Sequence, residues 1–252
     1  MNSLVFFFTL ALYQWADLRA PEHLEGWIQG WFGRVAHWLK PESRRALLLA
    51  VAVPLVLAAV LLLLADDGLF GWLALILGVI YLWVALGRQR FQLGSESVPV
   101  AGSVCSLIAV DEAYHNHLYG WFQSLFLVLF WTLLLGPVAG LLVYLLRQWL
   151  LLRPSAFGIK CWALVEWLPA RLMVLSFAAV GSFSHCMEVW RDAWLNWRFP
   201  VDEMLVHASR AALGEKNDTD SPEYLAELKE LHALLVRTLV LWVVLVALLV
   251  LI

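Results

Sequence analysis

The segment Glu166-Trp-Leu-Pro-Ala-Arg-Leu172 places an acid and a base in an otherwise apolar stretch. Charged side chains are costly inside a bilayer, so they are usually paired, face a cavity or are functional. Glu166 and Arg171 are five residues apart and do not lie directly over each other on one helix. Pro169 favours a helix that begins near Leu168, with Glu166 just before its positive end and Arg171 in its first turn.

This pattern leaves two interpretations open. The acid and the base either satisfy each other, or nearby backbone, at the junction of a broken helix. Alternatively, they help to form a polar pocket between helices.

The histidines and cysteines that could bind a metal or catalyse a reaction are poorly spaced for such a site. His115 and His117 are two apart and do not share a helix face, and His185 directly precedes Cys186. The sequence holds neither a phosphate-binding Gly-x-x-x-x-Gly-Lys loop nor a Gly-x-Ser-x-Gly nucleophile elbow. The residues therefore predict no catalytic group, no metal site and no cofactor.

The composition is that of a membrane protein. Hydrophobic residues make up 62% of the 252 positions, whereas soluble domains lie nearer about 45–50%. The 15 tryptophans suit surfaces at the level of the lipid headgroups, and three cysteines without a CxxC pair imply no disulfide framework. A net charge of −3 gives no basic balance that would indicate nucleic acid. The lipid bilayer is the expected partner.

Several apolar runs approach the roughly 20 residues that a spanning helix needs. The clearest runs are Ala46–Ala65, Leu69–Leu86 and Thr238–Ile252, the last extended by a few preceding residues. Phe122–Leu146 is also apolar, but Gly136-Pro137 interrupts it, and proline kinks or breaks a helix. It is either an ordinary kinked span or a broken helix that re-enters, which requires that protein bury the break.

The remaining segments indicate helices at or near the membrane surface. Leu4–Trp15 is too short to span easily, and Pro21–Lys40 has apolar residues at helical spacing. Ser95–His117 is polar enough for a cytoplasmic helical connection, and Ser221-Pro222-Glu223 reads as the start of a helix that runs to Ile252. We therefore expect an all-α, polytopic membrane helical bundle with amphipathic interfacial helices and broken membrane helices. Residues 1–45 form its interfacial part and residues 46–252 its integral part.

Two segments carry a resemblance to a known family. Ser124–Arg147, which reads SLFLVLFWTLLLGPVAGLLVYLLR, is followed by EWLPARL at Glu166–Leu172. In this order and spacing they resemble the AmpE branch of the CobD/CbiB membrane family, over about half of the chain. The resemblance implies a polar or ligand-binding pocket, for which the candidates are Asn116, Tyr144, Arg147, Glu166 and Arg171.

The family implies two different functions. One branch is similar to an ATP-using synthase that joins aminopropanol or its phosphate to cobyric acid. The AmpE branch resembles an inner-membrane regulatory protein linked to β-lactamase induction and cell-wall signalling. In the synthase pattern an acid-Asn-x-x-Asp-Gly run precedes the "LF", whereas here His115 and Tyr119 stand in place of the carboxylates. Mg²⁺ prefers hard oxygen ligands, so this departure favours the regulatory branch.

We therefore expect a multi-pass regulatory protein of the bacterial inner membrane that binds or senses and does not catalyse. Its partner is another membrane protein or a ligand derived from the cell wall. The alternatives are an adenosylcobinamide-phosphate synthase and a transporter subunit, which broken helices allow.

The distribution of arginines predicts the orientation. Arginines flank the hairpin of the first two spans, and the positive-inside rule places the turn at Asp66-Asp67 outside. If Phe122–Leu146 and Leu168–Phe183 both span, Arg147, Arg153 and Lys160 fall outside, against the rule. If both segments are broken or re-entrant, these cations stay inside. Either way, the segment from Arg191 to Arg237 is cytoplasmic.

Single cysteines introduced at Asp66 and at Asp218 test this orientation. An impermeant thiol reagent added from the periplasm should label the cysteine at position 66 and not the one at 218, because only the first lies outside. Labelling of position 218 alone would reverse the orientation.

Overall fold

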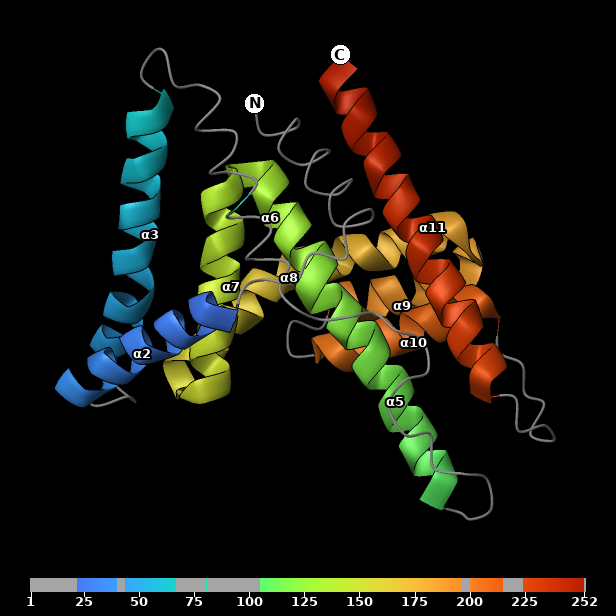
Figure 1. Cartoon of the computed structure of the whole chain (residues 1–252). Helices are drawn as coiled ribbons and strands as arrows, with labels where there is room; N and C mark the ends of the chain where they lie inside the picture. Colours follow the sequence, from blue (N-terminus) through green and yellow to red (C-terminus); the bar gives the residue numbers. More distant parts are fainter. Residues whose placement is uncertain are drawn as a thin grey trace. The chain divides into compact units, whose positions relative to one another are not determined.

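The computed structural model describes residues 22–39, 44–66, 80, 105–195, 200–214 and 224–251, and in these ranges it contains helices and no strand (Figure 1). The helices are α2 (Glu22–Trp38), α3 (Arg44–Asp66), α5 (Cys105–Trp121), the π-helix η1 (Phe122–Phe126), α6 (Leu127–Leu135), α7 (Pro137–Leu152), α8 (Ala156–Val180), α9 (Phe183–Leu195), α10 (Val201–Leu213) and α11 (Tyr224–Leu251).

Within the described residues, four helical segments are long and apolar enough to cross a membrane. They are Arg44–Leu61, Asp111–Leu135, Ala156–Val180 and Glu227–Leu248. Helix α7 is apolar but shorter. The chain is therefore an all-α membrane protein, which confirms the predicted fold class.

The chain forms two compact units. The first holds residues 1–89 and 127–165, and the second holds residues 90–126 and 166–252. The chain passes between the units at Phe126–Leu127 and again at Val165–Glu166, which lies inside α8. The predicted division into an interfacial part, residues 1–45, and an integral part, residues 46–252, does not coincide with these two units and stays a prediction.

Helix α2 is the amphipathic helix of the first unit. Ile28, Phe32 and Val35 are buried, and α2 packs against α3, as their helical spacing predicts. The ring of Phe32 meets the buried Trp149 of α7 edge-on, with centroids 5.3 Å apart. Trp38, at the end of the helix, is 81% exposed.

The break at Gly136-Pro137 separates two helices that pack side by side (Figure 1). Gly136 has a φ of 93°, which few residues other than glycine adopt readily, and Pro137 begins α7. An ordinary kinked span over Phe122–Leu146 is therefore wrong. The segment is instead the end of one helix and the start of the helix that folds back on it.

The second unit is held together by buried polar contacts between apolar helices. The indole N–H of Trp242 on α11 donates to Ser176 Oγ on α8 at 2.8 Å, and the Trp242 ring meets Phe126 edge-on. The backbone N–H of Ser182 donates to Ala212 O at 3.0 Å, which satisfies a carbonyl at the end of α10. Gly181 permits this approach, because a Cβ there would lie 2.6 Å from the same oxygen.

Two predicted boundaries are wrong. The helical connection Ser95–His117 was expected to end before the apolar segment at Phe122, but α5 runs without a break through His117 into η1 and α6; its cytoplasmic location stays a prediction. A helix was expected to begin near Leu168 and to end near Phe183, but α8 runs from Ala156 to Val180 with Pro169 inside it. By contrast, α3 and α11 match the spans expected from Ala46 and before Thr238.

Both helix-interior prolines are compensated in the same way. Proline has no N–H, so the carbonyl four residues earlier loses its helical partner. For Pro54 that carbonyl belongs to Ala50, and the indole N–H of Trp31 donates to it at 3.2 Å. For Pro169 it belongs to Val165, and the indole of Trp131 donates at 3.1 Å. Two tryptophans of this chain therefore serve inside the protein, and the headgroup-level role expected of tryptophans stays a prediction.

Some predicted elements lie outside the described residues. They are the helix Leu4–Trp15, the turn after Asp66, the return span Leu69–Leu86, the loop Asn217–Ser221 and the helix start at Pro222.

The tryptophan compensation can be tested with a double-mutant cycle. We expect Trp31→Phe to destabilise the protein in detergent by about 1–3 kcal/mol, because it leaves a buried carbonyl without a donor. Pro54→Ala restores an N–H to that carbonyl, so Trp31→Phe should cost less in the Pro54→Ala background. Trp38→Phe, at an exposed site, serves as the control. An equal cost of Trp31→Phe in both backgrounds would contradict the compensation.

Candidate functional site

Helix α8 carries both charged residues of the predicted motif. Because α8 continues through Pro169, Glu166 lies in mid-helix and not before a helix start. Glu166 and Arg171 are each only 3% exposed. Both belong to the second unit and to a segment long enough to span the membrane. Each of these two buried side chains therefore needs hydrogen-bond or charge partners inside the protein.

Two neutral donors hold the carboxylate of Glu166. The Tyr119 hydroxyl lies 2.8 Å from Oε1 and 3.0 Å from Oε2, and it donates to them. The Gln123 amide Nε2 donates to Oε1 at 3.0 Å. Tyr119 on α5 and Gln123 on η1 are four residues apart, so they share one helix face. The carboxylate therefore links α8 to the α5–η1 helix.

The π-helix lies at this link. η1 covers Phe122–Phe126, and Gln123 is in its first turn. One-turn π-helices are rare and often occur at functional sites. The Ser124 hydroxyl donates to Gly120 O at 2.6 Å, so a side chain takes up a backbone carbonyl where the helix widens.

Arg171 is held by its own helix. Its Nη1 donates to Trp167 O at 3.0 Å, and the guanidinium lies 4.4 Å from the centroid of the Trp167 ring. This is a cation–π contact, which is stronger where water is excluded. The predicted pairing of Glu166 with Arg171 stays a prediction.

The other predicted pocket residues fall in different places. Asn116 is exposed on α5 in the second unit. Tyr144 is buried on α7 and Arg147 is half-buried there, both in the first unit. A single pocket formed by all five candidates therefore stays a prediction.

Sequence reasoning missed Tyr119 and Gln123 as the partners of Glu166. The helical spacing of residues 116, 119 and 123 could have placed them on the face that carries the candidate Asn116. It could not have shown which helix that face meets.

The histidines contact different groups. His115 Nε2 lies 3.3 Å from Asp202 Oδ2, whereas the His117 ring lies 6.0 Å from that of His232 on α11. His185 Nδ1 is 2.8 Å from Ser182 Oγ, and its neighbour Cys186 is buried with Sγ 3.5 Å from Ala208 O. Burial raises the pKa of the Cys186 thiol to about 11, which keeps the thiol protonated at neutral pH. Among the described residues, no three His, Cys, Asp or Glu side chains gather as metal ligands do.

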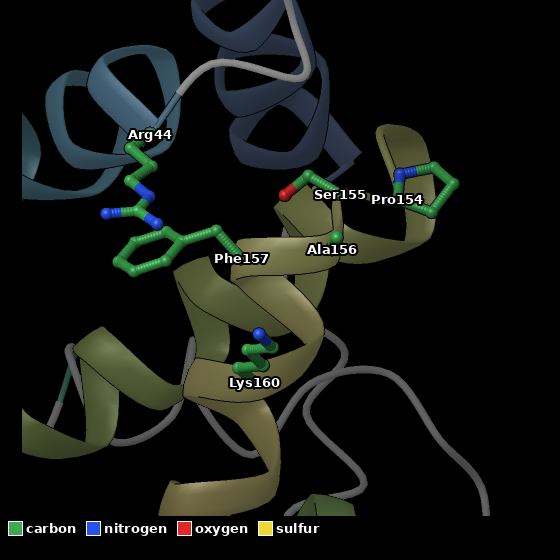
Figure 2. A pocket seen from close by; sticks show the side chains of 6 residues that line it. All are labelled: Arg44, Pro154, Ser155, Ala156, Phe157 and Lys160. Carbon is green, nitrogen blue, oxygen red and sulfur yellow. The ribbon is translucent and has the colours of Figure 1, made fainter.

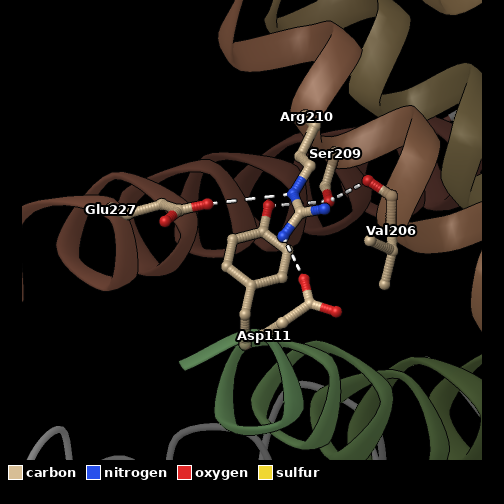
Figure 3. Close-up of polar contacts among 6 residues, drawn as sticks. Asp111, Val206, Ser209, Arg210 and Glu227 are labelled. Atoms are coloured by element: carbon tan, nitrogen blue, oxygen red, sulfur yellow. Dashed lines mark hydrogen bonds and ion pairs between the residues drawn. The ribbon is translucent and has the colours of Figure 1, made fainter. Parts of the chain in front are cut away.

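A second polar cluster joins α5, α10 and α11 (Figure 3). Arg210 Nη2 lies 2.5 Å from Asp111 Oδ1, and Arg210 Nε lies 3.8 Å from Glu227 Oε1. The guanidinium also lies over the Tyr114 ring, whose hydroxyl is 2.8 Å from Ser209 Oγ. Burial lowers the pKa of Arg210, but the bond to Asp111 and the nearby carboxylates outweigh burial and raise it.

This cluster constrains the topology of the second unit. Asp111 and Glu227 begin the candidate spans Asp111–Leu135 and Glu227–Leu248. Because Arg210 contacts both carboxylates, the two candidate spans begin close together within the second unit.

No protein-family model, curated protein or solved structure matches this chain.

The bond between Tyr119 and Glu166 can be measured by its dependence on charge. We expect Tyr119→Phe to destabilise the protein by about 1.5–3 kcal/mol, the usual loss for a hydrogen bond to a charged group. In a Glu166→Gln background the acceptor is neutral, so the same substitution should cost about 1 kcal/mol or less. Thermal unfolding in detergent gives both values. Equal costs in the two backgrounds would show that the Tyr119 hydroxyl binds the Glu166 carboxylate no more strongly than a neutral amide.

Proposed function

We propose that this chain is a regulatory protein of the bacterial inner membrane, of the AmpE type, which binds or senses and does not catalyse. The observation that carries the proposal is the bond from Tyr119 to Glu166. The family resemblance supplies the kind of regulation, which is β-lactamase induction and cell-wall signalling.

The side chain at position 119 distinguishes this chain from the synthase pattern. In the synthase pattern a carboxylate stands there, and two carboxylates at this distance would repel each other unless a cation lay between them. Tyrosine replaces that acceptor with a donor. The acid of the EWLPARL motif is thereby satisfied within the protein, which supports a chain that has kept the architecture without the Mg²⁺-dependent chemistry.

The same bond suits a sensor. Glu166 joins α8 to the α5–η1 helix through two side-chain donors. A ligand or partner that favours one arrangement of these helices shifts the population of the linked state. We propose a cell-wall-derived ligand or another membrane protein as that partner.

A transporter subunit is the second candidate. A buried carboxylate inside a candidate span favours it, because such groups mark proton and ion pathways. Proton flux in proteoliposomes that is lost in Glu166→Gln would select the transporter over the regulator.

The regulatory proposal is tested in two strains. In a strain that needs an adenosylcobinamide-phosphate synthase, we expect no cobalamin-dependent growth when this chain is well expressed, because position 119 lacks a carboxylate. In the native host, we expect deletion and Tyr119→Phe to change β-lactamase induction, and Trp38→Phe to leave it unchanged. Growth that depends on Glu166 would support the enzyme, and unchanged induction in the deletion strain would contradict the regulator.

A further inference from the structure

A pocket of about 470 Å³ lies in the first unit, where α3 and α8 begin (Figure 2). Its lining residues are Arg44, Pro154, Ser155, Ala156, Phe157 and Lys160. The Arg44 guanidinium lies over the Phe157 ring, 5.2 Å from its centroid, and the Lys160 side chain lies on the next turn of α8. Of the described residues that line the pocket, two are cationic and none is acidic, which favours an anion.

The start of α8 adds to this preference. Ser155 is buried, and its Oγ accepts the Gly158 N–H at 3.1 Å, so it caps the helix. The N–H groups of Ala156 and Phe157 belong to the first turn, where the helix supplies no acceptor. Ala156 and Phe157 line the pocket, so the positive end of the helix dipole lies beside it.

Close packing fixes the pocket. A Cβ on Gly158 would lie 2.9 Å from Leu47 Cδ1 and 2.6 Å from Leu150 Cδ2. Glycine therefore lets the first turn of α8 approach α3 and α7. This approach brings Arg44 and Lys160 to one cavity although they are distant in sequence.

The surroundings of the pocket select a lipid over a free anion. Arg44 and Ala156 are the first residues of two candidate spans, so the pocket lies at the membrane boundary. Large apolar side chains beside it are exposed: Leu48 by 55%, Leu151 by 68% and Ile159 by 57%. Acyl chains can cover such side chains, and inorganic phosphate cannot. Basic pockets between spans near the membrane boundary bind anionic headgroups.

We propose that this pocket binds the phosphate headgroup of an anionic phospholipid, with Arg44, Lys160 and the first turn of α8 as its ligands. The acyl chains lie along the exposed leucine and isoleucine side chains of α3, α7 and α8. Arg44 stacks on Phe157, which orients the guanidinium without neutralising it.

The test uses the full chain in a neutral detergent, and native mass spectrometry measures lipid binding. The probes are dioctanoyl-phosphatidylglycerol, dioctanoyl-phosphatidylcholine and inorganic phosphate. Arg44→Gln with Lys160→Gln removes the two pocket cations. Arg34→Gln with Lys229→Gln removes the same charge elsewhere, and Arg34 likewise lies over an aromatic ring, that of Trp31.

We expect phosphatidylglycerol to bind the unaltered chain and the control variant equally. Its dissociation constant should rise about twenty-five-fold in the pocket variant, at about fivefold for each cation. Phosphatidylcholine should bind more weakly, and inorganic phosphate should not compete. The exposed single variant Lys160→Glu should weaken binding in the same direction without affecting the fold. Equal binding by the two double variants would overturn the site, and effective competition by phosphate would overturn the lipid assignment.

Discussion

The indole N–H of Trp131 donates to the carbonyl of Val165, and the course of α8 depends on this bond. Pro169 cannot supply the N–H that this carbonyl needs, and an unsatisfied carbonyl in an apolar setting costs several kcal/mol. With the indole in place, the helix continues for 25 residues and holds Glu166 and Arg171 in its interior. Without it, a helix break before Pro169 would leave the acid at a helix end, where water or the helix dipole could satisfy it.

The Trp131–Val165 bond also illustrates which parts of the fold the sequence could predict and which it could not. Apolar length located α3 and α11, helical spacing located α2, and Gly136-Pro137 located the break between α6 and α7. These signals are local, so one sequence reveals them. Proline at position 169 carries the same local signal as a helix start, and only a tryptophan 38 residues earlier cancels it. Local patterns cannot contain that information.

The candidate site likewise combines a feature visible in the local sequence with contacts that are not. The motif identified Glu166 and Arg171 as buried charges, because charge in an apolar run is visible in the sequence. The partners of Glu166 were not visible, because Tyr119 and Gln123 lie more than 40 residues away and one sequence does not show which helix their face meets. The burial of α5 decides this point. Because α5 continues through η1 into the apolar α6, the face that holds Tyr119 and Gln123 meets α8, where Glu166 is their acceptor.

The polar side chains of these sites fall into two groups, those buried in the middle of helices and those near helix starts. In mid-helix, neutral donors satisfy the carboxylate, and an aromatic ring and a backbone carbonyl hold the guanidinium of Arg171. Arg44 and Lys160, near the starts of two candidate spans, are exposed, whereas Asp111 and Glu227 at the starts of the other two contact Arg210. Buried groups with internal partners resist exchange with solvent and fix the helices, whereas cations at the boundary can exchange partners with the lipid.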